Sequence, residues 1–231
     1  MLPRFEVVAR RRPVALTAPG SGPVRAPYVA VEAPGSPELT LSGGPVTLTA
    51  TFEGRVTLHL TTDGRTTSHR SRRSGRPEGP VEAVALTLTG PQVTAFTREA
   101  GSWVARARAD LTERYDVHDE TWLSGLTVSH SMGRFGQLGL RDLRLVSQSD
   151  GSPYLRDGRL LLTATSAGPG GFTTGHCSVW SLDPETLELE HRADLFVRRG
   201  VDHGVYGDHA AHLLRDGDRW LLAASTWGDF D

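Results

Sequence analysis

Two similar stretches near the C-terminal end decide the fold: DGSPYLRDGRLLLTATS at residues 150–166 and DHAAHLLRDGDRWLLAAS at residues 208–225. Each has an aspartate, a short apolar segment, an Arg-Asp-Gly turn and a second, more apolar segment. Glycine adopts the positive φ of a tight primed turn without strain, so Asp-Gly between two apolar runs predicts a β-hairpin. The chain is therefore predicted to form at least two such hairpins.

The spacing of the two stretches suggests a repeat. Asp150 and Asp208 lie 58 positions apart, and the turn aspartates Asp157 and Asp216 lie 59 apart. A further predicted hairpin, from Cys177 to Leu189, lies between them. Two hairpins per period are typical of a β-propeller. We expect a first blade at about 150–198 and a second blade that begins at 208 and has two strands.

Such a propeller needs more chain than is present. At about 60 residues per blade, five blades would require roughly 300 residues. We therefore expect the 231 residues to be a fragment whose missing C-terminal blades are its natural partner. The unpaired strand 220–224 is expected to make the fragment poorly soluble or oligomeric.

Short alternating strands fill the first half of the chain. Segments such as 38–41, 46–50 and 56–60 place apolar residues at every second position, which predicts strands with one buried face. The fold class is therefore predicted as all-β. We expect a β-sandwich-like accessory domain at 1–124 and a partial β-propeller at 125–231. The acidic segment 111–123 is the expected junction.

Composition limits the possible partners and locations. A formal net charge of -2 gives no support for binding nucleic acid or an anionic membrane. No segment approaches the ~20 apolar residues that span a bilayer. The single cysteine, Cys177, allows no intrachain disulfide and fits a reducing compartment, so a cytoplasmic location is expected. A catalytic role for this thiol is possible, although a half-buried strand position explains it more simply.

The region 138–231 resembles the start of the catalytic domain of five-bladed β-propeller glycosidases of glycoside hydrolase families 43 and 32. In that family an aspartate opens the innermost strand of the first blade, a few residues before a turn like Arg156-Asp157-Gly158. A second aspartate opens the next blade, as in Gly207-Asp208-His209. The first-half strands also resemble a lectin-like or laminin-G-like sandwich.

The resemblance implies catalytic roles for carboxylates. Glycoside hydrolysis uses two carboxyl groups that flank the scissile bond. Asp150 would be the base or nucleophile, and Asp208 would orient the general acid and raise its pKa. Asp142 is the alternative base. The family's general acid is a glutamate of the third blade, which this chain lacks. Family aspartates are commonly followed by proline, whereas here Pro153 comes three residues after Asp150.

Other side chains are candidates for sugar contacts: Tyr206, His209, His176 and Trp227. His203, His209 and His212, with Asp202, have metal-ligand residue types, but residues 209 and 212 point to opposite faces of a strand. Acidic residues around His118 likewise match no known metal spacing. The basic segment 69–78 could bind an anion or be a solvated loop. No metal and no cofactor are predicted.

The predicted function is a carbohydrate-active protein, a glycoside hydrolase that lacks its general-acid blade, with a carbohydrate as substrate or ligand. The alternative is a non-catalytic propeller that binds carbohydrate or serves as a scaffold. A third possibility is a compact all-β protein in which the two Asp-Gly hairpins are a coincidence.

Overall fold

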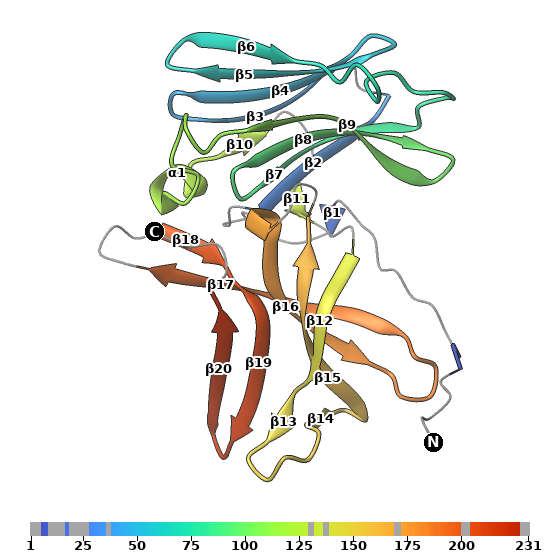
Figure 1. Cartoon of the computed structure of the whole chain (residues 1–231), viewed down its shortest axis with the longest axis vertical. Helices are drawn as coiled ribbons and strands as arrows, with labels where there is room; N and C mark the ends of the chain where they lie inside the picture. The colour runs from blue at the N-terminus through green and yellow to red at the C-terminus, as the bar shows by residue number, and fades with distance from the viewer. Residues whose placement is uncertain are drawn as a thin grey trace.

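The prediction of an all-β fold is confirmed. The computed structural model describes residues 6–8, 17–18, 28–35, 38–128, 132–135, 139–168, 172–199 and 204–226. These residues form several open sheets in which nearly all neighbouring strands are antiparallel. Figure 1 shows the N-terminal sheets stacked above a second group of strands from the C-terminal half.

The N-terminal part is sandwich-like and contains two sheets. One has six strands in the order β1-β11-β2-β7-β8-β9, and the other has five in the order β10-β3-β4-β5-β6. The strands of the six-stranded sheet are β1 (Thr17–Ala18), β2 (Tyr28–Pro34), β7 (Ala83–Thr89), β8 (Gln92–Glu99), β9 (Ser102–Asp110) and β11 (Met132–Phe135). Those of the five-stranded sheet are β3 (Glu38–Gly43), β4 (Val46–Phe52), β5 (Val56–Thr62), β6 (Arg65–His69) and β10 (Thr127–Val128).

The alternating pattern of the sequence explains this packing. Leu39, Leu41 and Leu58 of the five-stranded sheet share one core with Leu86 and Leu88 of β7. Every residue of β7 is buried, because the other face of its sheet lies against the C-terminal part of the chain. A smaller core on that side includes Ala85 and Phe96 and is joined by Phe196 from the C-terminal part. The six-stranded sheet is therefore the middle layer of the molecule (Figure 1).

The C-terminal part, residues 139–226, is called the second unit below. Its larger sheet has the order β12-β15-β16-β17-β18 with β14 paired to β15, and its smaller sheet has the order β13-β19-β20. The larger sheet contains β12 (Gly139–Leu145), β14 (Leu155–Arg156), β15 (Arg159–Ala167), β16 (Gly175–Leu182), β17 (Leu189–Arg199) and β18 (Gly204–Gly207). The smaller contains β13 (Ser147–Gln148), β19 (His209–Asp216) and β20 (Arg219–Ser225), and the 3-10 helix η1 (Phe172–Thr174) precedes β16.

Strand pairing places the change from one part to the other later than residue 124. The short strands β10 and β11 pair with β3 and β2, so both belong to the sandwich sheets. The next strand, β12, pairs with β15 of the second unit. The two parts therefore divide between β11 and β12.

One short helix, α1 (Glu120–Ser124), lies in the acidic segment between β9 and β10. Asp119 caps it, because its carboxylate accepts hydrogen bonds from the backbone N–H groups of Thr121 and Trp122. Trp122 and Leu123 are buried in the sandwich core. Within the described ranges, no helix is long and apolar enough to cross a membrane.

Candidate active site at two matching bulges

Two antiparallel strand pairs, β12 with β15 and β19 with β20, carry the same irregularity at the same register. In the first, β12 pairs Arg141 with Thr165 and then resumes at Arg144 with Thr163. In the second, β19 pairs His209 with Ser225 and resumes at His212 with Ala223. In each case two residues oppose one, which defines a β-bulge. Thr165 and Ser225 are each six residues beyond the arginine that follows the hairpin turn, so the bulges occupy equivalent positions.

Each bulge contains one non-glycine residue in the left-handed region: Asp142 with φ 54° and Ala210 with φ 51°. This conformation costs an L-residue about 1 kcal/mol or more, because Cβ approaches the carbonyl oxygen. Bulges re-aim side chains and are over-represented beside active sites. The left-handed residues Asp63 and Asp157 are different, because each precedes a glycine in a hairpin turn.

A threonine hydroxyl joins the two bulges. The backbone N–H of Ala210 donates to Thr165 Oγ1 at 2.9 Å, and that hydroxyl donates to Asp142 Oδ2 at 2.8 Å. Beside it, Thr163 Oγ1 donates to the carbonyl oxygen of Ala211 at 2.5 Å. The bulge residues Ala210 and Ala211 have no partners on β20. Their backbone N–H and carbonyl groups instead form hydrogen bonds with the hydroxyls of Thr165 and Thr163 on β15. The second hairpin is thereby fixed against the larger sheet, and Asp142 is fixed beside both.

Asp208 enters the same region from the residue before β19. Its side chain is buried and forms an ion pair with Arg199 of β17. Its carbonyl oxygen accepts a hydrogen bond from Cys177 Sγ at 3.0 Å. The pKa of this buried thiol is raised to about 12, mainly by burial and in smaller part by the negative charges of Asp208 and Asp142.

The sandwich supports Asp208 through aromatic contacts. The Arg199 guanidinium lies over the Tyr206 ring, 5.1 Å from its centroid. The Tyr206 ring also stacks on the His118 ring of the sandwich, with 4.1 Å between the ring centroids. The backbone N–H of Val205 donates a hydrogen bond to the His118 carbonyl oxygen at 2.9 Å. This bond joins β18 of the second unit to the sandwich. Tyr206, predicted as a sugar contact, thus contacts Arg199, which in turn forms the ion pair with Asp208.

The predicted residues His209 and His176 are both buried beside this region. A Cβ on Gly175 would lie 2.7 Å from His209 Cε1, so the absence of a side chain at residue 175 lets the imidazole pack onto β16. His176 Nε2 lies 2.9 Å from Asp194 Oδ1, and His191 Nε2 lies 2.9 Å from the same oxygen. Burial alone would raise the pKa of Asp194, but the two histidine hydrogen bonds outweigh it and lower that pKa.

Asp150, the predicted base, lies elsewhere. It is exposed in a tight turn, where its Oδ1 accepts hydrogen bonds from the backbone N–H and hydroxyl of Ser152 at 2.9 and 2.7 Å. These bonds lower its pKa. The preceding strand, β13, pairs with Leu214 and Arg215 near the turn end of β19, whereas Asp208 precedes the other end. About six residues of strand, or roughly 20 Å, therefore separate the two regions.

A loop excursion explains this placement. The strand that pairs with β15 is interrupted after Val146 and resumes at Tyr154, whose N–H donates to the Val146 carbonyl oxygen at 2.8 Å. The residues between them, which include Asp150, lie outside the hairpin. Their spacing from Asp157 in the sequence resembles that of Asp208 from Asp216, but the strand position is different. The structure links Asp142 through Thr165 to the start of β19, which Asp208 precedes, and does not place Asp150 there.

The remaining candidates that the structure describes do not come together as a metal site. Trp227, Asp202 and His203 lie outside the described residues. His212 Nε2 is 3.3 Å from Ser147 Oγ, in a separate contact of β19. Over the ranges that the structure describes, no three His, Cys, Asp or Glu side chains are grouped as a metal would require.

Two residues of the site were not found from the sequence. Thr165 has no distinguishing motif, because threonine at every second position is common in strands. Arg199 lies in Arg198-Arg199, and only the strand register shows that it faces Asp208 whereas Arg198 reaches Glu120.

Comparisons of the chain with protein-family models, with curated proteins and with solved structures gave no match.

Proposed function

We propose that this chain forms part of a carbohydrate-processing site, in which Asp142 is the base or nucleophile of glycoside hydrolysis and Asp208 is the auxiliary carboxylate. The observation that carries the proposal is the junction of the two bulges, where Thr165 links the strained Asp142 to the start of β19, directly after the buried Asp208. Residues in strained backbone conformations are concentrated at functional sites.

The two carboxylates have environments suited to different roles. Asp142 belongs to an exposed stretch of β12 and accepts a hydrogen bond from Thr165, so one of its oxygens is oriented while the residue remains open to solvent. Asp208 is buried and paired with Arg199, which holds its carboxylate in a fixed position. Glycosidases commonly assign different tasks to carboxyl groups in unlike environments. This division supports Asp142 over Asp208 as the group that attacks or activates water.

The test uses activated aryl glycosides, whose leaving groups depart without protonation and therefore need no general acid. Hydrolysis by the chain is measured for a panel of pyranosides and furanosides, together with the variants Asp142→Asn and Asp150→Asn. Asparagine also tolerates the left-handed conformation of residue 142. We expect Asp142→Asn to lower the rate by ~10²-fold or more.

Asp150→Asn is the matched control, since the same chemical change is made in an exposed turn. It is expected to leave the rate within a factor of about two, because a side chain remote from the reacting atoms gives no transition-state stabilisation. Equal losses in both variants, or none in either, would remove Asp142 from the proposed mechanism. Binding of a non-hydrolysed sugar without turnover of any glycoside would favour the non-catalytic alternative.

A further inference from the structure

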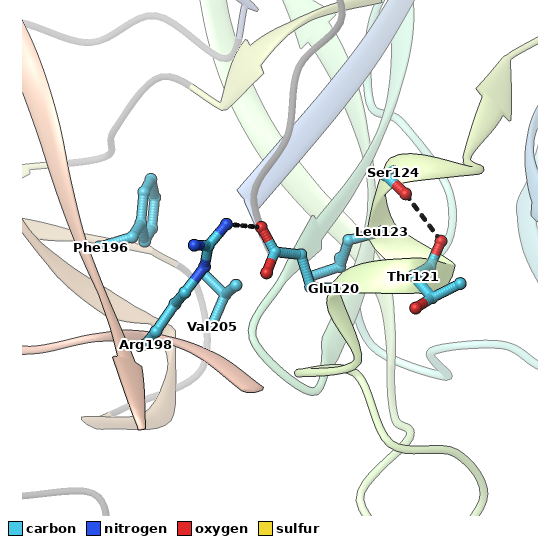
Figure 2. A pocket seen from close by; sticks show the side chains of 7 residues that line it. All are labelled: Glu120, Thr121, Leu123, Ser124, Phe196, Arg198 and Val205. Carbon is cyan, nitrogen blue, oxygen red and sulfur yellow. Dashed lines mark hydrogen bonds and ion pairs between the residues drawn. The ribbon is translucent and has the colours of Figure 1, made fainter. Parts of the chain in front are cut away.

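The junction between the sandwich and the second unit contains a groove of about 570 Å³ that none of the candidate site residues line. Its walls come from α1 on one side and from β17 and β18 on the other (Figure 2). Grooves between domains are frequent ligand sites, and a volume of 300–1,000 Å³ is typical of them. The groove is lined by Glu120, Thr121, Leu123, Ser124, Phe196, Arg198 and Val205.

The charged groups of the groove are balanced. Arg198 and Glu120 reach toward one another across the gap in Figure 2 and form an ion pair. The side chain of Arg198 is 69% exposed and that of Glu120 is 36% exposed, so both can also contact a ligand. Since these are the two charged residues among the lining side chains, the wall carries no net formal charge. This arrangement suits an uncharged polar ligand better than an anion or a cation.

The uncharged part of the wall is amphipathic. Phe196 is half-buried and provides the apolar surface, whereas Thr121 and Ser124 carry hydroxyl groups. A pyranose or furanose ring has the same division, with C–H groups on a face and hydroxyls at the edge. Aromatic side chains bind such a face, and paired charged side chains form strong hydrogen bonds with hydroxyls.

We infer that this groove is a second carbohydrate-binding site, which takes a neutral oligosaccharide between Phe196 and the Arg198–Glu120 pair. The ligand class rests on the proposed function, whereas the position of the site does not. The groove also adjoins the candidate active site through β18. Val205 lines it, and the next residue, Tyr206, contacts Arg199, the partner of Asp208.

The experiment is calorimetric titration of the intact chain with maltohexaose, xylohexaose and arabinohexaose. Arg198→Gln removes the charge and the bidentate fork from an exposed pair, so it is expected to leave folding intact. Phe196→Leu keeps an apolar side chain but removes the ring face. Each variant is expected to raise the Kd of the bound hexasaccharide at least about tenfold, because a hydrogen bond to a charged group or an aromatic contact contributes that much.

Arg156→Gln is the control, since Arg156 is about as exposed as Arg198 and forms its ion pair with Asp157, outside the groove. It is expected to leave Kd unchanged, and thermal unfolding checks that Phe196→Leu is folded. Saturable binding that both groove variants retain would overturn the inference, as would no binding of any hexasaccharide. Failure of the catalytic proposal is distinguishable, because Asp142→Asn would then retain hydrolysis while the groove variants still lost binding. Binding lost only in Asp142→Asn would place the sugar at the bulges and overturn the groove.

Discussion

The sandwich and the second unit differ in how their sheets are joined. In the sandwich, leucine and valine side chains of two sheets fill one continuous core. In the second unit, the larger sheet and the second hairpin meet through hydrogen bonds from Thr163 and Thr165 to bulged backbone. Its buried apolar cluster is small and centres on Leu162, Ala164 and Trp180. The sandwich is therefore held together mainly by apolar packing, whereas the second unit relies more on ordered polar groups at its bulges.

The surface shows the same contrast. Among the side chains that the structure describes, the large exposed apolar ones on strands are all in the second unit, at Leu143, Leu145, Leu155, Trp220, Leu221 and Leu222. Successive residues of β20 are exposed on both faces, and β20 is an edge of its sheet. Unpaired edges with apolar side chains promote association. Oligomerisation of the chain stays a prediction that this surface supports.

The largest expected effect contrasts a leucine in the sandwich core with an exposed leucine of the second unit. Leu58→Ala removes a fully buried side chain from the sandwich and should lower the free energy of unfolding by about 2–5 kcal/mol. Leu222→Ala makes the same change at a residue that is 44% exposed and should cost less than about 1 kcal/mol. Urea denaturation followed by circular dichroism measures both. If both variants lost the same free energy of unfolding, β20 would have to be covered by another surface in solution.

A second prediction concerns the buried carboxylate of the second unit. Asp194→Asn weakens the hydrogen bonds to His176 and His191 and should lower the free energy of unfolding by about 1–3 kcal/mol. Because the folded-state pKa of Asp194 is lowered, its ionised form stabilises the protein above about pH 4, and this contribution is lost as the pH falls below that value.

Denaturation at pH 5 and pH 3 tests the sign of this dependence. The wild-type protein should lose more stability between the two values than Asp194→Asn does, because the variant has no carboxylate to protonate at residue 194. An equal slope in both proteins would mean that the histidine contacts do not hold the Asp194 carboxylate in solution.

The smallest expected change in stability concerns the hydroxyl between the bulges. Thr165→Val leaves the Ala210 N–H without its acceptor and should cost about 1–2 kcal/mol. It should also lower hydrolysis, since Asp142 loses the donor that orients it. Thr165→Ser keeps the hydroxyl and should retain most activity. Unchanged activity in Thr165→Val would show that the bulge alone positions Asp142.

The sequence was sufficient to predict features set by local chemistry. Alternation predicted the strands of the sandwich, and both Arg-Asp-Gly segments form hairpins. The Arg-Asp-Gly motif nevertheless sits differently in the two turns. In the first, Asp157 and Gly158 form the two-residue loop. In the second, Asp216 is paired with Arg219, so the loop begins one residue later in the motif, at Gly217. Local propensity does not specify register, because alternative two-residue turns accept the same residues.

The candidate site depended on long-range pairing and was only partly predictable. Asp208 was found because it immediately precedes its strand. Asp142 was only the alternative base, since the excursion between Val146 and Tyr154 cannot be seen in the sequence and gave Asp150 the spacing expected of the base. Bulges add residues without leaving a composition signal. The arrangement of sheets as propeller blades remains a proposal drawn from the repeat.

The most direct measurement is chemical rescue of Asp142→Gly. Glycine relieves the positive φ at this position, so the variant should fold at least as well as the wild-type protein. Without a carboxylate it should hydrolyse activated aryl glycosides ~10²-fold or more slowly. Added azide should restore turnover and yield a glycosyl azide, with Asp150→Gly as the control that needs no rescue. Retention of activity within a factor of about three by Asp142→Gly, far short of the loss of a base or nucleophile, would contradict the account.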